Sequence, residues 1–110
     1  MSGFTEISPQ QAWQMLQEND QAVLADVRRG DHFALAHLAG AVNLTEQTWQ
    51  QFSQHYEYDQ PIIVSCYHGI SSRTIATFLA QQGYEQIYSV IGGFEAWQQA
   101  GYPMVSDLAK

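Results

Sequence analysis

The chain has 110 residues, of which 45% are hydrophobic and 14% charged, and its net charge is -7 at pH 7. This length fits one domain spanning residues 1–110, and the apolar share suffices for a packed core, which excludes a disordered chain. The acidic balance argues against a nucleic-acid-binding protein, which needs basic residues to displace counterions, and against a protein that adheres to an anionic membrane.

The N-terminal segment shows no basic stretch followed by an apolar run, so we expect no secretory signal and a cytoplasmic protein. No apolar run approaches the length of a membrane span. A first strand is expected over Phe4–Ile7. Ser8 followed by Pro9 is typical of an N-cap and first helical residue, which predicts a helix ending near Glu18.

Short apolar segments alternate with helical segments along the rest of the chain. The runs Val23-Leu24-Ala25 and Ile62-Ile63-Val64 are typical of strands covered on both faces. This alternation predicts an α/β domain with a mostly parallel sheet, whose ligand site lies at the C-terminal ends of the strands. We expect strands over Ala22–Val27, Ala41–Leu44, Pro61–Cys66 and Ile87–Ile91, and helices over Asp31–His37, Thr45–Gln54 (with Thr45 as N-cap), Ser71–Gln82 and Gly93–Gln99.

The aromatic side chains and the histidines have mostly structural interpretations. His32 and His37 are five residues apart, which is the wrong spacing for one metal-binding face of a helix, so no metal site is predicted. A set of large aromatic residues is expected in the core: Trp13, Phe33, Phe78, Phe94 and Trp97.

Cys66 is the only cysteine, so it has no partner for an internal disulfide, and a zinc site needing two thiolates is excluded. It ends an expected buried strand, and the helix with the clearest sequence pattern, Ser71–Gln82, is expected to begin five residues later. Backbone N–H groups of such a loop, together with the helix dipole, lower the pKa of a thiol below its usual value of about 8.5. The loop alone leaves a buried inert cysteine and a reactive thiolate equally open.

The residues after the cysteine form the candidate cradle for an anion or for the outer sulfur of a persulfide. Gly69 permits a tight loop, and the hydroxyls of Ser71 and Ser72 can cap the helix or donate into the cradle. Arg73 suits an anion-binding or a salt-bridge role. His68 is either a nearby base or an exposed loop residue, with the latter favoured. The complete candidate set is Cys66 as nucleophile with Tyr67, His68, Gly69, Ile70, Ser71, Ser72 and Arg73.

Three ordered motifs resemble the rhodanese family over nearly the whole chain. The first combines Leu24–Arg28, Asp31–Phe33 and His37–Asn43, with Ala36 where glycine is commoner; the second is the cysteine loop; the third is Gly92–Pro103. The similarity is greatest to the GlpE-type single-domain thiosulfate sulfurtransferases of bacteria, whose loop also reads Cys-Tyr-His-Gly.

The resemblance implies a five-stranded parallel sheet with helices on both faces and a ping-pong reaction. The Cys66 thiolate takes the sulfane sulfur of thiosulfate, releases sulfite and becomes a persulfide. Cyanide, or a dithiol protein such as thioredoxin, then accepts that sulfur. The resemblance implies neither a metal nor an organic cofactor.

Two other functions stay open beside this one. The related dual-specificity phosphatases have Cys-x5-Arg, a loop one residue longer than Cys66–Ser71, because a phosphate needs a wider cradle and a bidentate arginine. The shorter loop therefore disfavours phosphatase or arsenate reductase activity. A non-catalytic rhodanese-like module is disfavoured by the intact cysteine. Tyr67 and His68 stand where some rhodaneses have basic residues, which predicts weak thiosulfate binding. Scaffold roles are expected for Asp26 and Arg28, and for the glycine pair 92–93 near the loop.

Overall fold

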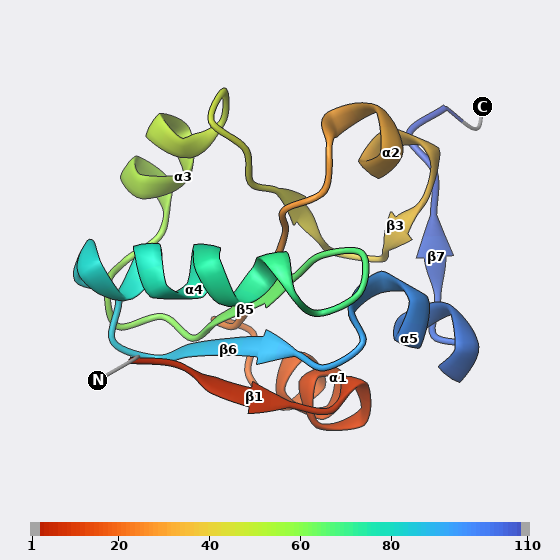
Figure 1. Cartoon of the computed structure of the whole chain (residues 1–110), viewed down its shortest axis with the longest axis horizontal. Coiled ribbons are helices and arrows are strands. Elements are labelled where there is room, and N and C mark those ends of the chain that lie inside the picture. The colour runs from red at the N-terminus through yellow and green to blue at the C-terminus, as the bar shows by residue number, and fades with distance from the viewer. Residues whose placement is uncertain (1–2, 109–110) are drawn as a thin grey trace.

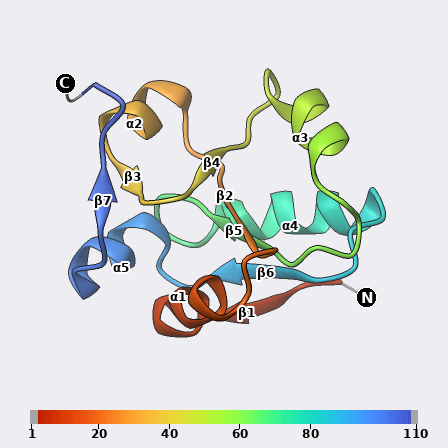
Figure 2. The same cartoon turned by 180° about the vertical axis from the view of Figure 1, so that it is seen from behind.

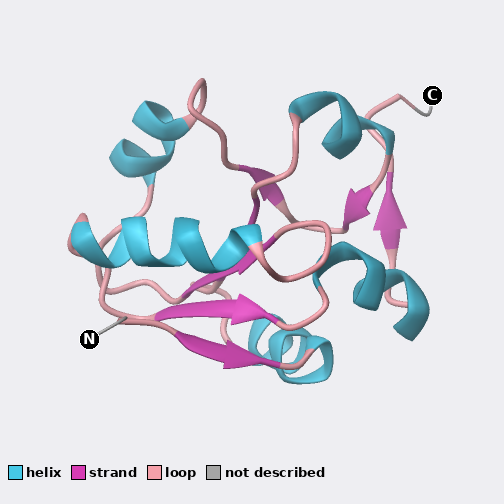
Figure 3. Ribbon diagram, viewed as in Figure 1, coloured by secondary structure: helices cyan, strands magenta, loops and turns pink. Residues whose placement is uncertain are grey.

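The computed structural model describes residues 3–108, so Met1 and Ser2, part of the segment searched for a secretory signal, lie outside the described residues. Five strands form one parallel sheet in the order β1-β6-β5-β2-β4 (Figures 1 and 3). This confirms the predicted five-stranded parallel sheet. The strands are β1 (Thr5–Ile7), β2 (Val23–Asp26), β4 (Val42–Asn43), β5 (Ile62–Ser65) and β6 (Ile87–Val90).

Helices cover both faces of the sheet, and side chains alternate between the faces along each strand. Ile62 and Val64 of β5 pack with Leu79 in a core beneath α3 (Trp49–His55) and α4 (Ser71–Gln81). Ile63 points the other way and packs with Trp97 in a second core beneath α1 (Pro9–Glu18) and α5 (Gly93–Ala100), which Figure 2 shows from behind. Because both faces are buried, the central strands need the continuous apolar runs that the sequence shows.

A second, two-stranded sheet was not predicted. The antiparallel strands β3 (His37–Leu38) and β7 (Met104–Val105) pair beside α2 (Gly30–Leu35). The expected helix Asp31–His37 was therefore too long: the chain is extended at Ala36, and His37 belongs to a strand. A two-residue strand carries no readable periodicity, and its pairing partner lies far along the sequence.

Three further sequence expectations are corrected. Helix α3 begins at Trp49 rather than Thr45, because Thr48 Oγ1 accepts a hydrogen bond from the Thr45 N–H and holds residues 45–48 in a turn. Phe78 is 37% exposed and is not a core residue, whereas Trp97 is fully buried. Trp13 is half-buried against the second core, whereas Phe33 and Phe94 are half-buried outside both cores, against His37 and Arg28 respectively.

The parallel register gathers the C-terminal ends of the central strands at one edge. Asp26 pairs with both Asn43 and Ser65, and Val64 pairs with Ser89. The loops that follow β2, β4, β5 and β6 therefore leave the sheet side by side. Over residues 3–108, none of the helices has the length and apolar character that a membrane crossing requires.

Candidate active site

Cys66 lies directly after β5, and its sulfur is held by backbone amides of the loop that follows. Its side chain is buried, with 2% of the residue exposed. The sulfur accepts hydrogen bonds from the Gly69 N–H at 3.1 Å and from the Ser72 N–H at 3.2 Å. The Ser72 donor belongs to the first turn of α4, where N–H groups have no partner inside the helix. The sulfur thus occupies the position of a helix-capping acceptor.

The expected capping of α4 by serine hydroxyls is wrong. Ile70 stands at the N-cap and no side chain there bonds into the helix. The Ser72 hydroxyl instead lies 2.7 Å from the Ser89 hydroxyl of β6, and both residues are fully buried. The two serines therefore fix the start of α4 against the sheet directly behind the thiol.

The orientation of the loop amides is set by α5. Its Phe94 N–H donates to the Cys66 carbonyl at 2.6 Å, and its Glu95 N–H donates to the Tyr67 carbonyl at 3.2 Å. In a trans peptide the N–H points opposite to the carbonyl of the same unit. With these two carbonyls held toward α5, the N–H groups of Tyr67 and His68 are directed away from α5.

Two glycines allow this close approach of α5 and the loop. Gly69 has φ +87°, and a Cβ there would lie 2.6 Å from the Gly92 nitrogen. Gly93 has φ +56°, and a Cβ there would lie 2.4 Å from the Cys66 carbonyl oxygen. Both the backbone angle and the lack of space therefore require glycine at these positions.

The environment of Cys66 favours the thiolate. Burial by itself raises the pKa of the thiol, but hydrogen bonds from the Ser72 hydroxyl and from the N–H groups of Ser72, Gly69 and His68 outweigh it and bring the pKa below its usual value. Hydrogen bonds that favour the charged form act in this direction. The loop therefore stabilises a thiolate through these hydrogen bonds, and no cationic side chain within residues 3–108 contributes to the shift.

The side chains of Tyr67 and His68 point in different directions. The Tyr67 hydroxyl hydrogen-bonds to Nδ1 of His32 from α2, which ties the loop to the segment after β2. His68 is exposed, with its Nδ1 3.7 Å from the Glu95 carboxylate. The favoured expectation of an exposed loop histidine agrees with this position.

Arg73 and Ile70 do not point their side chains at the sulfur. Nε of Arg73 donates to the Gly69 carbonyl at 3.2 Å and lies 3.0 Å from the Glu6 carboxylate. Ile70 is 67% exposed, and Ser71 is exposed as well. These residues belong to the loop, but what contacts the sulfur is backbone and the Ser72 hydroxyl.

Asp26 and Arg28, for which the sequence predicted scaffold roles, form a buried salt bridge. The Arg28 guanidinium donates to both carboxylate oxygens of Asp26 and to the Ala36 carbonyl. It also lies 3.7 Å from the centre of the Phe94 ring and 5.7 Å from that of Tyr67. This pair joins the ends of β2 and α5 to the cysteine loop.

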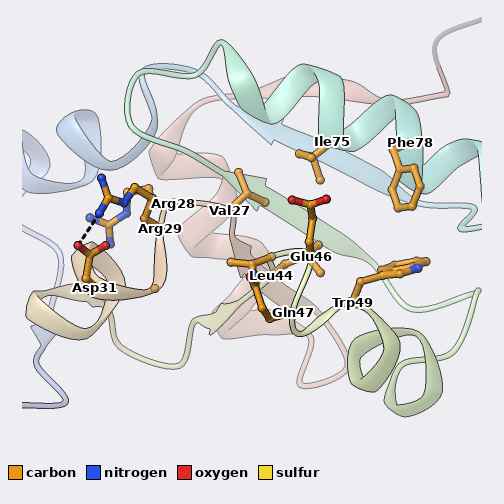
Figure 4. Close-up of a pocket in the computed structure, with 12 residues that line it drawn as sticks. Val27, Arg28, Arg29, Asp31, Leu44, Glu46, Gln47, Trp49, Ile75 and Phe78 are labelled. Atoms are coloured by element: carbon orange, nitrogen blue, oxygen red, sulfur yellow. Dashed lines mark hydrogen bonds and ion pairs between the residues drawn. The ribbon is translucent and has the colours of Figure 1, made fainter.

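A groove with a volume of about 860 Å³ lies between the loops after β2 and β4 and helix α4 (Figure 4). Ile75 and Phe78 point from α4 toward Leu44 and Trp49 on the opposite side, and the Glu46 carboxylate stands between them. Sequence reasoning missed this groove because its walls come from three separate segments. Within residues 3–108, no three histidine, cysteine or acidic side chains are grouped so that they could hold a metal ion.

Sequence reasoning also missed several residues around the loop. Ser89, the Phe94 N–H and the His32 ring each contact the site from an element distant in sequence. Backbone donors carry no residue-type signal, and the only available clue was the glycine pair 92–93.

The chain is similar to proteins of known families. Residues 8–100 match the model of the rhodanese-like domain. The chain is 57% identical over 101 residues to a protein of Actinobacillus succinogenes named thiosulfate sulfurtransferase GlpE, covering 92% of this chain and 90% of that protein. A protein of the same name from Haemophilus influenzae is 52% identical, with 92% and 94% covered.

Solved structures show the same fold at lower identity. The Alr3790 protein of Anabaena superimposes with a TM-score of 0.84 at 19% identity, covering 93% of this chain and 81% of that one. A polysulfide-sulfur transferase homodimer of Wolinella succinogenes superimposes with a TM-score of 0.78 at 22% identity, covering 94% and 80%.

Proposed function

The chain belongs to the rhodanese-like domain family, and from that premise we propose that it is a thiosulfate sulfurtransferase that carries a sulfane sulfur on Cys66. The observation that carries the proposal is the sulfur of Cys66, held by the N–H groups of Gly69 and Ser72 at the end of β5. Relatives that bear this activity in their names match 92% of the chain at 52–57% identity.

In the first half-reaction the Cys66 thiolate attacks the outer sulfur of thiosulfate. The bond between the two thiosulfate sulfurs breaks, and its electron pair leaves with sulfite. The outer sulfur of the resulting persulfide is negatively charged, and the amide-lined loop stabilises it through backbone dipoles. Such dipoles are needed because the chain as a whole carries a charge of -7 and repels anions at long range.

In the second half-reaction a nucleophile attacks the outer sulfur and the Cys66 thiolate leaves. With cyanide the product is thiocyanate. With a dithiol protein such as thioredoxin, the first thiol accepts the sulfur, and the second then displaces it as hydrosulfide while a disulfide forms. The low pKa of the Cys66 thiol makes it a good leaving group in this step.

The persulfide cycle supports a cytoplasmic location. It requires Cys66 to return to the thiolate after each turnover, and the cytosol keeps thiols reduced. The cycle uses no metal and no organic cofactor.

A phosphatase or arsenate reductase is a less suitable interpretation of the same loop. Those reactions need a bidentate arginine facing the anion. Here the only arginine of the loop, Arg73, bonds to the Gly69 carbonyl and to Glu6. A non-catalytic binding module is also a less suitable interpretation, because binding alone does not require a thiol whose pKa is lowered.

Thiosulfate:cyanide sulfurtransferase activity, measured as thiocyanate, tests the proposal. The wild type is expected to turn over and Cys66→Ser to be inactive, with both proteins showing the same circular dichroism spectrum. Turnover by Cys66→Ser would refute the persulfide mechanism. No turnover by folded, reduced wild type would remove thiosulfate as the donor.

A further inference from the structure

The groove of Figure 4 begins about one helical turn from the thiol. Ser72 donates to the Cys66 sulfur, and Ile75 and Phe78 of the groove follow it on the same helix. At 1.5 Å per residue, these two side chains lie about 5 and 9 Å farther along the axis of α4. Arg28 lines the groove and also lies over the Tyr67 ring of the cysteine loop. The groove thus lies next to the cysteine loop.

All but one of the charged residues that line this groove form an ion pair. Arg28 pairs with Asp26, and Arg29 pairs with Asp31 at 2.9 Å. Glu46 is the one charged residue of the lining that has neither a hydrogen bond nor an ion pair within the described part of the chain. A ligand with one positive charge complements this arrangement.

The walls around Glu46 are apolar and aromatic. Trp49 and Phe78 meet at 4.9 Å between ring centres, and Phe78 keeps 37% of its surface exposed. Val27, Leu44 and Ile75 complete the apolar part of the lining. An aromatic pair of this kind, partly exposed and next to a charged group, is typical of the anchor sites of protein interfaces.

We propose that this groove receives the polypeptide segment that presents an acceptor thiol to Cys66, with a basic side chain against Glu46 and an apolar side chain beside Trp49 and Phe78. The inference rests on the proposed sulfurtransferase function and specifies the chemistry of its acceptor. Cyanide is far smaller than the groove and attacks the persulfide without using it. A segment of several residues fills the groove and reaches the thiol.

Two synthetic acceptor peptides test this proposal: acetyl-Leu-Lys-Leu-Gly-Cys-amide and the same peptide with glutamate in place of lysine. Extended, each spans about 17 Å, enough to reach from Phe78 to the sulfur. The rate of sulfur loss from thiosulfate-loaded Cys66 gives kcat/KM for each peptide. The wild type is expected to prefer the lysine peptide by about fivefold, the size of a partly exposed charge pair.

Variants at exposed acidic positions distinguish the effect of Glu46 in the groove from the effect of the protein's overall negative charge. Glu46→Gln is expected to reduce the preference for the lysine peptide, and Glu46→Lys to reverse it. Glu85→Lys makes the same change in net charge two residues before β6, near the N-terminal ends of the strands and away from the groove, and is expected to keep most of the wild-type preference. Phe78→Ser is expected to lower kcat/KM for both peptides several-fold. Cyanide turnover is expected to stay unchanged in all four variants.

The contrary results are distinct from one another. A wild type that does not discriminate between the peptides, or equal effects of Glu46→Lys and Glu85→Lys, would overturn the groove as the acceptor site. If the lysine and glutamate peptides accept sulfur no faster than 2-mercaptoethanol while cyanide turnover is normal, the groove does not bind the acceptor and the inference is overturned. Failure to form the persulfide at all would overturn the proposed function and this inference with it.

Discussion

Two helices of this molecule satisfy their first N–H groups in opposite ways. Helix α1 is closed by its own side chains: Ser8 Oγ accepts from the Gln11 N–H at 3.1 Å, and Gln11 Oε1 accepts from the Ser8 N–H at 2.9 Å. Helix α4 has no side-chain cap, and its Ser72 N–H donates to the sulfur of Cys66 at 3.2 Å. At α1, side chains of the helix itself satisfy these N–H groups, and no reactive group takes part.

The difference shows where this fold combines stability with chemistry. In α1 the capping box only stabilises the helix. In α4 the capping acceptor is also the proposed nucleophile, and the same hydrogen bonds that complete the helix lower the pKa of its thiol. A change near α4 should therefore alter folding and activity together, and a change at the start of α1 should alter folding alone.

The largest effect is expected from Gly93→Ala, which breaks the contact that orients the loop. The new Cβ would lie 2.4 Å from the Cys66 carbonyl, at φ +56°. We expect unfolding to become easier by about 2–5 kcal/mol, from backbone strain and overpacking. Displacement of the loop should lower kcat/KM for thiosulfate by about tenfold or more. Chemical denaturation and the thiocyanate assay measure the two effects.

Gly101→Ala at the other end of α5 is the control for Gly93→Ala. Its φ is +80°, but a Cβ there has nothing within 4 Å. It should cost about 1–2 kcal/mol from the backbone angle alone and leave activity unchanged. Equal behaviour of the two variants would show that the close approach of α5 does not orient the loop.

A smaller effect, on ionisation, is expected from Ser72→Ala. Loss of the Ser72 hydroxyl removes a hydrogen bond that lowers the pKa of the Cys66 thiol, so that pKa should rise. The thiolate absorbance, corrected with Cys66→Ser, should then appear at higher pH, and turnover at neutral pH should fall. Because the pKa of the Cys66 thiol in folded wild type lies below that of an unfolded thiol, the thiolate stabilises the wild type above the unfolded pKa. This contribution is lost as the pH falls through the folded pKa, and it should shrink in Ser72→Ala.

Ser89→Ala sharpens the same test. It removes the same serine–serine hydrogen bond but leaves the Ser72 hydroxyl free to donate to the sulfur. Each variant should be destabilised by about 1 kcal/mol, because each loses the buried hydrogen bond between the two serines. Only Ser72→Ala should raise the pKa of the thiol clearly. A similar rise in both would mean that the pKa depends on packing rather than on this donor.

The smallest effect is expected from Ser8→Ala at α1. Loss of the capping box should lower the free energy of unfolding by about 1 kcal/mol. The thiol pKa and kcat/KM should stay at their wild-type values, because α1 makes no contact with the sulfur. A change in activity would contradict the separation of the two helix ends.

Much of the fold follows from local patterns in the sequence. The continuous apolar runs of β2 and β5 and the Ser8–Pro9 start of α1 each express one nearby physical cause, and each prediction is confirmed. Helix boundaries were less predictable, since Thr48 rather than Thr45 stands before α3. The pair β3–β7 depends on contacts between distant segments, which no local pattern reveals.

The environment of Cys66 was partly predictable, and its surroundings were less so. The position of Cys66 between a buried strand and a helix indicated a lowered pKa, and the structure gives that direction. A role for the Tyr67 and Arg73 side chains in holding the transferred sulfur stays a prediction. The Tyr67 hydroxyl contacts His32, and the Arg73 guanidinium contacts Glu6. The main donors are backbone groups aimed by α5, and residue types do not encode that direction.

The most direct test of the account is the intact mass of the reduced protein after incubation with thiosulfate and no acceptor. We expect the mass to increase by one sulfur atom, which peptide mapping locates on Cys66 and which is lost again when cyanide is added. No gain, or the same gain in Cys66→Ser, would contradict the claim that the amide-held sulfur of Cys66 carries the transferred atom.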